Sequence, residues 1–162
     1  MRGLGQRLLG LLIQYINRRE DDSRFLNEAR AVGLSYGGET AVRVPPILEK
    51  YCLSICSGDF NQWTTKVAAT DAPFSFMRTI EWEMPYWNLG QTFDYAEMTY
   101  LMVPRPFMVE RGHLDRVGRD QWVAHEYAKV RFLYAQLGLT DRTEIEFFQG
   151  GQIGRASCRE RV

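Results

Sequence analysis

The sequence has few of the residues that bind metals or form disulfides. It contains three cysteines and two histidines in 162 residues, and one cysteine, Cys158, lies in an irregular C-terminal segment. Cys52 and Cys56 lie four residues apart in an apolar run, so we expect buried thiols rather than a disulfide or a metal pair. No cluster with metal-ligand spacing and no phosphate-binding loop occurs in the sequence.

A charge excess of one sign and long apolar runs are also lacking. The formal net charge is zero, and without residues 153–162 the chain has 17 basic and 19 acidic residues. This mild acidity argues against nucleic acid as a partner. The apolar run from Leu8 to Ile13 is too short to span a membrane and lacks a signal-peptide cleavage site. It fits an amphipathic helix, extending to Ile16, that covers a sheet and leads into the first strand.

The last ten residues, Ile153 to Val162, differ from the rest of the chain. They contain three arginines, have no periodic apolar face and resemble a translated sequencing adaptor. We therefore treat 153–162 as a non-native tail and assign residues 1–152 to one globular piece. On this interpretation the natural sequence is given only to about Gly151. Only the first base of the codon for Gln152 would then be native, and glutamine and histidine codons share that first base.

The stretch Gly33-Leu34-Ser35-Tyr36-Gly37-Gly38 is the most informative part of the sequence. It matches the G-x-S-x-G pattern of a nucleophile elbow, a tight strand-to-helix turn that holds a serine Oγ out into an active site. We expect glycine to be required two residues before and two residues after the serine, because Cβ atoms there would clash with neighbouring backbone. The motif predicts serine-hydrolase chemistry with Ser35 as the nucleophile.

Apolar strands that alternate with helices predict an α/β fold with a parallel sheet. The expected strands are Ala29–Val32 and Tyr51–Cys56, both buried, the first half of Arg105–Asp115, and Thr143–Phe148 at an edge. The expected helices are Glu39–Val44, ended by Pro45 and Pro46, and Asp120–Leu137, capped by Gly138. The apolar face of the second helix contains Val123, Tyr127, Val130, Leu133 or Tyr134, and Leu137.

The segment from Phe60 to Leu101 is long, rich in aromatic residues and interrupted by proline, glycine, aspartate and asparagine. Such a composition is typical of a lid that supplies apolar walls to a substrate pocket. Packing in a satellite core is the alternative for each aromatic residue. These residues are Trp63, Phe74, Phe76, Trp82, Tyr86, Trp87, Phe93 and Tyr95.

Asp115 is the best-placed candidate for a catalytic carboxylate. It lies just beyond the glycine that ends the third expected strand. Functional side chains gather at the carboxyl ends of strands in open parallel sheets, so Ser35 and Asp115 are expected to share one rim. Glu110 and Asp120 are alternative acids that stand less well at a strand end.

Together, the order of these features resembles the α/β-hydrolase superfamily, in particular its bacterial dienelactone hydrolase and acetyl xylan esterase-like branch. The resemblance covers the chain from about Ala31 to Gly151. It rests on G-L-S-Y-G-G at the elbow, on R-P-F-M-V-E-R-G-H-L-D around the acid, and on E-F-F-Q-G-G at the start of the histidine loop. Serine, acid and histidine follow in the order expected for this fold.

The resemblance implies a role for each matched position. Ser35 corresponds to the nucleophile, Asp115 to the carboxylate that orients the imidazole, and the backbone N–H of Tyr36 to one oxyanion donor. The family's histidine should follow Gly151, where this sequence has Gln152, whose amide cannot act as a general base. The remaining histidines, His113 and His125, we interpret as pocket or surface residues.

The resemblance also implies that the front of the domain is missing. A complete domain has about four further strands before the nucleophile strand, and one of their loops supplies the second oxyanion N–H. We therefore expect the C-terminal half of a serine carboxylic-ester hydrolase, inactive as written, with no cofactor and a small-molecule ester as the substrate of its parent. An unpaired apolar edge on the nucleophile strand would favour self-association. A prolyl oligopeptidase-type peptidase and a noncatalytic binding module on the same fold remain alternatives.

Overall fold

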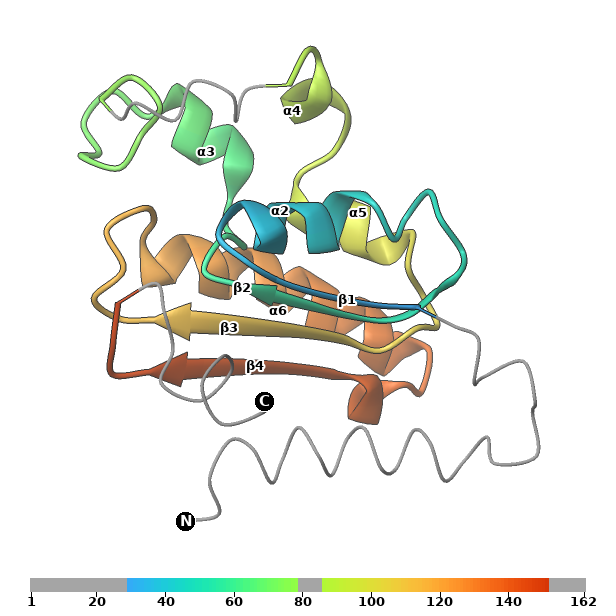
Figure 1. The fold of residues 1–162 in the computed structure, drawn as a ribbon. Helices are drawn as coiled ribbons and strands as arrows, with labels where there is room; N and C mark the ends of the chain where they lie inside the picture. The colour runs from blue at the N-terminus through green and yellow to red at the C-terminus, as the bar shows by residue number, and fades with distance from the viewer. Residues whose placement is uncertain (1–28, 79–85, 152–162) are drawn as a thin grey trace, which may run out of the picture.

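A four-stranded parallel sheet forms the centre of the molecule. The computed structural model describes residues 29–78 and 86–151, so the expected helix before the first strand, Gln152 and the tail lie outside the described residues. The strands follow one another across the sheet in chain order. They are β1 (Ala29–Leu34), β2 (Tyr51–Ser57), β3 (Phe107–Gly112) and β4 (Thr143–Phe148). Their carboxyl ends lie together on the left of Figure 1.

The predicted α/β class and all four predicted strands are confirmed. The expectation that the first strand is buried is wrong, because no residue from Arg30 to Leu34 is buried and Val32 is 61% exposed. Val32 pairs in register with Ile55 of β2, which packs with Met108 in a small cluster separate from the main core. The side chain of Val32 therefore lies on the face of β1 away from the main core.

Three helices cover the main face of the sheet, α2 (Tyr36–Arg43), α5 (Tyr95–Tyr100) and α6 (Asp120–Gln136). In Figure 1, α2 and α5 lie above the sheet and α6 behind it. The core between these layers is built from apolar side chains of all three helices and of β2 and β3. It includes Val42, Cys56, Tyr95, Met98, Phe107, Val109, Val123, Tyr127, Val130 and Tyr134.

Helix α6 follows its predicted apolar face except at the end. Tyr134, not Leu133, is the fully buried member of that pair, and Leu137 is 52% exposed because it already belongs to the C-cap. Gly138 follows with a φ of 70°, a conformation that glycine adopts without strain, so the predicted cap is confirmed.

The aromatic segment divides into a core part and an outer part. The core part contains Phe60, Trp63 and Tyr95, which are almost completely buried, so for these residues packing in a core is correct. The outer part contains Tyr86 and Trp87, which are exposed. Helices α3 (Trp63–Ala68) and α4 (Leu89–Thr92) stand above the sheet layer in Figure 1. Trp82 lies outside the described residues.

A single carboxylate joins the outer helix α3 to the core helix α5. Asp94 accepts hydrogen bonds from the backbone N–H of Trp63 at 2.7 Å and of Tyr95 at 2.8 Å, and from the Thr64 hydroxyl at 2.7 Å. The first residues of α3 and α5 are thus held at one point.

The two cysteines of the described region are buried thiols, as the sequence predicts. Within residues 29–78 and 86–151, no helix combines the length and the apolar character that crossing a membrane requires.

Candidate active site

Ser35 occupies a strained turn between β1 and α2. Its backbone angles are φ 56° and ψ −122°, in a region that residues other than glycine rarely adopt. The turn is held on both sides, because the Ser35 N–H donates to the Ser57 carbonyl at 2.9 Å and its carbonyl accepts from the Glu39 N–H at 3.0 Å. Such strain persists only where the surroundings enforce it, and a sharp turn of this kind is the geometry of a nucleophile elbow.

Two of the three glycines around Ser35 are sterically required. A Cβ on Gly33 would lie 1.8 Å from the Gly37 carbonyl oxygen, and a Cβ on Gly38 would lie 2.7 Å from the Ser57 carbonyl oxygen. A Cβ on Gly37 would meet nothing within 4 Å. The expectation that glycine is required two residues after the serine is therefore wrong. The second close approach is one residue later, where α2 crosses the end of β2.

Tyr36 is the first residue of α2, and its side chain is 48% exposed. Backbone N–H groups in the first turn of a helix point out of its N-terminal end, where the helix dipole favours negative charge. The position of Tyr36 directly after Ser35 thus suits the oxyanion donor that the sequence motif implies.

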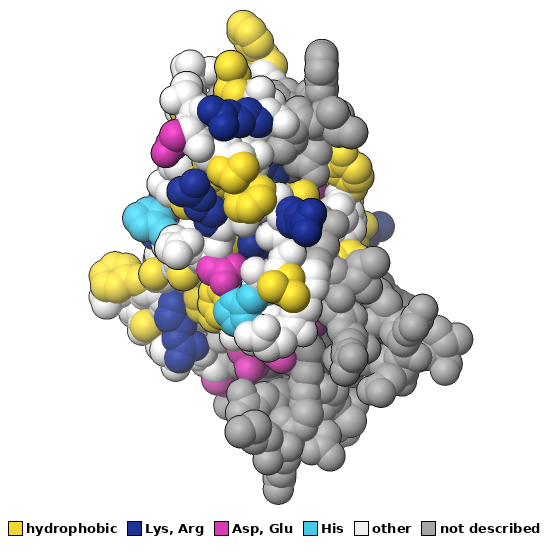
Figure 2. All heavy atoms as spheres, turned by 90° about the vertical axis from the view of Figure 1, so that its left-hand side faces the viewer, with side chains coloured by type: hydrophobic (Ala, Val, Ile, Leu, Met, Phe, Trp, Pro, Cys, Tyr) yellow, Lys and Arg dark blue, Asp and Glu magenta, His cyan; other side chains and the backbone are white. Residues whose placement is uncertain are grey.

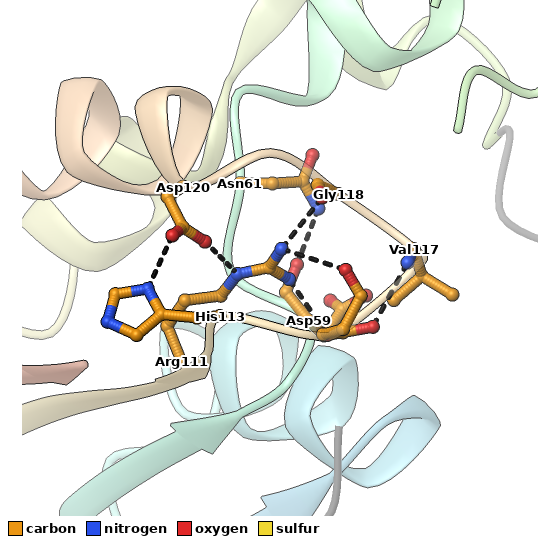
Figure 3. Close-up of polar contacts among 8 residues, drawn as sticks. Asp59, Asn61, Arg111, His113, Val117, Gly118 and Asp120 are labelled. Carbon is orange, nitrogen blue, oxygen red and sulfur yellow. Dashed lines mark hydrogen bonds and ion pairs between the residues drawn. The ribbon is translucent and has the colours of Figure 1, made fainter. Parts of the chain in front are cut away.

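Asp115 lies in the loop that follows β3, where it is only 6% exposed. Its Oδ2 accepts a hydrogen bond from Nη1 of Arg111 at 2.8 Å, and its Oδ1 accepts one from the Val117 N–H at 3.0 Å. Figure 3 labels the two donors, Arg111 and Val117. Ser35 and Asp115 follow strands that are two positions apart in the sheet, a separation of roughly 10 Å at ordinary strand spacing. An imidazole placed between them would fill such a gap.

The end of β4 leads toward the same loop. The Leu114 N–H donates to the Gly150 carbonyl at 2.8 Å, and a Cβ on Gly112 would lie 2.0 Å from the Gly151 carbonyl oxygen. The chain therefore leaves Gly151 beside the residues that carry Asp115. Gln152, where the resemblance implies the histidine, lies outside the described residues.

Neither of the two histidines is directed toward the elbow. The His113 ring stacks on Phe147 of β4 with centroids 5.6 Å apart, and its Nδ1 lies 2.6 Å from Oδ2 of Asp120. These contacts hold His113 on the side of β3 away from Ser35. His125 is exposed in the second turn of α6.

The alternative acids occupy different surroundings. Glu110 lies within β3 and is 3% exposed, and its Oε2 has no hydrogen-bond partner among the described residues. Asp120 begins α6 with a side chain that is 33% exposed. Burial acts to raise the pKa of Asp120, but hydrogen bonds from His113 and Arg111 outweigh it and lower the pKa. Asp115 combines a strand-end position with nearly complete burial.

Asp59 is a buried carboxylate that sequence reasoning missed. It follows β2, next to the elbow, and its carboxylate accepts a hydrogen bond from the hydroxyl of Tyr95. Burial raises the pKa of Asp59 to about 7, although the Tyr95 hydrogen bond and the charge of Lys66 act to lower it. Only its position in Ser57-Gly58-Asp59 at a strand end could have indicated a role. A carboxyl group that is half protonated near neutral pH is less suited than Asp115 to hold an imidazolium.

The surface over the carboxyl ends of the strands is chemically mixed. Figure 2 shows basic, acidic and apolar side chains interspersed on this face, with histidine at two separate places. In the part of the chain that the structure describes, no group of three histidine, cysteine or acidic residues is arranged to hold a metal ion.

Two solved structures show the fold to which this arrangement belongs. One is a glucuronoyl esterase of carbohydrate esterase family 15 from Caldicellulosiruptor kristjansonii, with 16% sequence identity and a TM-score of 0.55 over 75% of this chain. The other is an acylaminoacyl peptidase from Pyrococcus horikoshii, with 14% identity and a TM-score of 0.57 over 87% of this chain. The chain has the α/β-hydrolase fold, as the sequence predicts.

The chain spans 37% of the length of that esterase and 22% of the length of that peptidase. No protein-family model and no curated protein matches the sequence. The likeness to the solved structures therefore concerns the fold.

Proposed function

We propose that the protein is part of a serine carboxylic-ester hydrolase of the dienelactone hydrolase and acetyl xylan esterase-like branch. The observation that carries this proposal is the strained backbone of Ser35 between β1 and α2, at the same rim as the buried Asp115. Strain of this kind costs about 1–3 kcal/mol, and it clusters at functional sites. An ordinary glycine-serine turn would not require it.

The proposed reaction has two steps. Ser35 Oγ attacks the ester carbonyl while a histidine after Gly151 takes its proton, and the N–H of Tyr36 stabilises the oxyanion. The C–O bond to the alcohol breaks, and the alcohol leaves with the proton from the imidazolium. Water then attacks the acyl-serine, giving one proton to the histidine, and the acid is released as Ser35 regains its proton. Asp115 holds the imidazole throughout. No metal or organic cofactor takes part.

We propose that the 162-residue sequence carries only part of this machinery. Position 152 is glutamine, and the described sheet begins with the nucleophile strand, so the proposal assigns the base and second oxyanion donor to the uninterrupted protein. We further propose that the edge of β1 that pairs with no other described strand favours self-association of the shorter chain.

The test measures hydrolysis of p-nitrophenyl acetate by the protein expressed from its uninterrupted reading frame. Ser35→Ala is expected to lower kcat/KM by about four orders of magnitude or more, whereas loss of a structural serine would act mainly on stability. Circular dichroism shows whether the variant is folded. A folded Ser35→Ala protein that retains most of the activity contradicts the assignment.

A peptidase is the second candidate, favoured by the similarity to the acylaminoacyl peptidase. The same Ser35 would then form an acyl-enzyme from a peptide. Comparing kcat/KM for p-nitrophenyl acetate and for short peptide p-nitroanilides distinguishes the two, because an esterase should cleave the anilides at least about a hundredfold more slowly.

A further inference from the structure

Arg111 connects the candidate acid to the rest of its loop. It is the second-last residue of β3, and its side chain is only 4% exposed. Nη1 donates to Oδ2 of Asp115 at 2.8 Å, and Nε donates to Oδ1 of Asp120 at 2.9 Å. Nη2 donates to the Asp115 carbonyl at 3.2 Å and to the Gly118 carbonyl at 2.7 Å. Figure 3 shows the loop wrapped around this guanidinium.

The partners of Arg111 include two carboxylates, one within the loop and one at its end. The Asp115 side chain is 1% exposed, and that of Asp120 is 33% exposed. A carboxylate as buried as Asp115 is stable as an anion only when a cation or several hydrogen-bond donors compensate for its lost hydration. Arg111 supplies the cation, and the Val117 N–H supplies a further donor.

We propose that Arg111 is the positioning residue of the catalytic acid, which it keeps ionised and fixed at the end of β3. This inference rests on the proposed function, because it assigns Asp115 to the triad. Arg111 itself touches no reacting atom. It acts on Oδ2 and on the loop carbonyls, so that the orientation of the Asp115 carboxylate toward an imidazole N–H is set before substrate binds.

The geometry requires arginine rather than any cation. The three nitrogens of the planar guanidinium donate four hydrogen bonds. The acceptors are the carboxylates of Asp115 and Asp120 and the carbonyls of Asp115 and Gly118. A lysine ammonium has a single nitrogen and cannot span these acceptors from the same backbone position. Arg111→Lys should therefore preserve the charge but lose the loop geometry.

Arg105 offers a matched control in the same chain. It also donates several hydrogen bonds, to the carbonyls of Met102 at 3.0 Å, Tyr51 at 2.9 Å and Pro45 at 2.8 Å. Pro45 and Met102 lie before β2 and β3, and Tyr51 is the first residue of β2, so these acceptors are at the opposite end of the sheet from Asp115. Arg105→Met should lower the melting temperature while leaving kcat within about threefold of the unaltered protein.

The experiment measures kcat and KM for p-nitrophenyl acetate in the protein from its uninterrupted reading frame, together with thermal melting. Arg111→Met is expected to lower kcat about a hundredfold with KM changed less than threefold, since a misplaced catalytic group costs about this factor. Arg111→Lys should lower kcat at least tenfold. In the Asp115→Asn background, Arg111→Met should have no further effect, because the arginine acts through that carboxylate.

Several outcomes would overturn the inference while leaving the proposed function intact. One is that Arg111→Met or Arg111→Lys folds and keeps an unaltered kcat, although Asp115→Asn has lost most of its activity. Another is that Arg111→Met lowers kcat by the same factor in the Asp115→Asn background as in the unaltered protein. If Arg111→Met does not fold, the kcat of Arg111→Lys decides. Unaltered activity of Ser35→Ala and Asp115→Asn would instead remove the proposed function.

Discussion

The two halves of the candidate site are held in place by different means. At the end of β1, backbone geometry positions Ser35 through a strained φ and close approaches at Gly33 and Gly38. At the end of β3, the side chain of Arg111 contacts Asp115 through two hydrogen bonds and holds the rest of the loop through two more, to Asp120 and Gly118. A nucleophile placed by its backbone leaves a recognisable sequence motif, whereas an acid placed by side chains leaves little.

The largest expected effect is the loss of activity in Asp115→Asn, which distinguishes Asp115 from the other two carboxylates near β3. Asp115→Asn should leave the uninterrupted protein folded and lower kcat by roughly three to four orders of magnitude, because the histidine loses the group that fixes its tautomer. Glu110→Gln and Asp120→Asn should each cost less than about tenfold, since Glu110 lies within the strand and Asp120 at the start of α6. Steady-state hydrolysis of p-nitrophenyl acetate checks all three. A crippled Glu110→Gln protein would show that the acid is wrongly assigned.

The second prediction concerns the 162-residue chain itself. It should not react with a fluorophosphonate probe at Ser35, and Gln152→His alone should not restore reactivity. One absent oxyanion donor costs about 3 kcal/mol, or about a hundredfold in rate, even after the base is restored. Mass spectrometry of the labelled protein measures the reaction. Rapid, stoichiometric labelling of a monomer would show that a base is already present.

The third prediction tests whether backbone contacts hold the elbow. Gly33→Ala should destabilise the protein by more than about 3 kcal/mol, because its Cβ would overlap the Gly37 carbonyl, which cannot move without breaking the turn. Gly37→Ala should be neutral or stabilising by up to about 1 kcal/mol, because alanine favours the helix. Urea unfolding of the two variants compares these free energies. Equal destabilisation would contradict the described turn.

The fourth prediction concerns Asp59, whose effect on stability is spread over several pH units. Its pKa is about 7 in the folded protein, against an ordinary value of 3.8 for an aspartate in water, so the folded state binds the proton more tightly than the unfolded state. Stability at this site should therefore fall between about pH 4 and pH 7, by at most roughly 1.4 kcal/mol per pH unit. Asp59→Asn should remove this decline. Urea unfolding at pH 5 and pH 8 measures the difference in the free energy of unfolding. If Asp59→Asn shows the same pH dependence as the unaltered protein, the raised pKa of Asp59 is contradicted.

The sequence predicted the sheet well because each strand carries its own signal. A continuous apolar run marks β2 and β3, and alternation marks β4. The prediction of burial was wrong for Val32 and Leu137. Burial at these positions depends on which strand face or helix end meets the core, and not on the residue type. The Ser35 turn was predictable, because the elbow motif includes flanking glycines, and Gly33 and Gly38 are needed for the close backbone approaches around the turn.

The polar side chains around the acid could not have been predicted in the same way. Arg111 and Asp120 are ordinary charged residues nine positions apart, and their meeting depends on the path of the loop between them. The same holds for Asp59 and Tyr95, which are 36 positions apart and meet only once α5 has packed over the sheet. Periodicity reports faces of helices and strands, and it carries no information about such pairings.

The contact between Gly112 and Gly151 limits how the two loops of the rim can evolve. A single methyl group at position 112 would push the chain after β4 away from the sheet, since it would lie 2.0 Å from the Gly151 carbonyl oxygen. The loops on either side can change in sequence or length as long as this crossing keeps its spacing. A library that diversifies residues 113–119 for new substrates should therefore leave Gly112 unaltered, because the crossing is the fixed point from which both loops start.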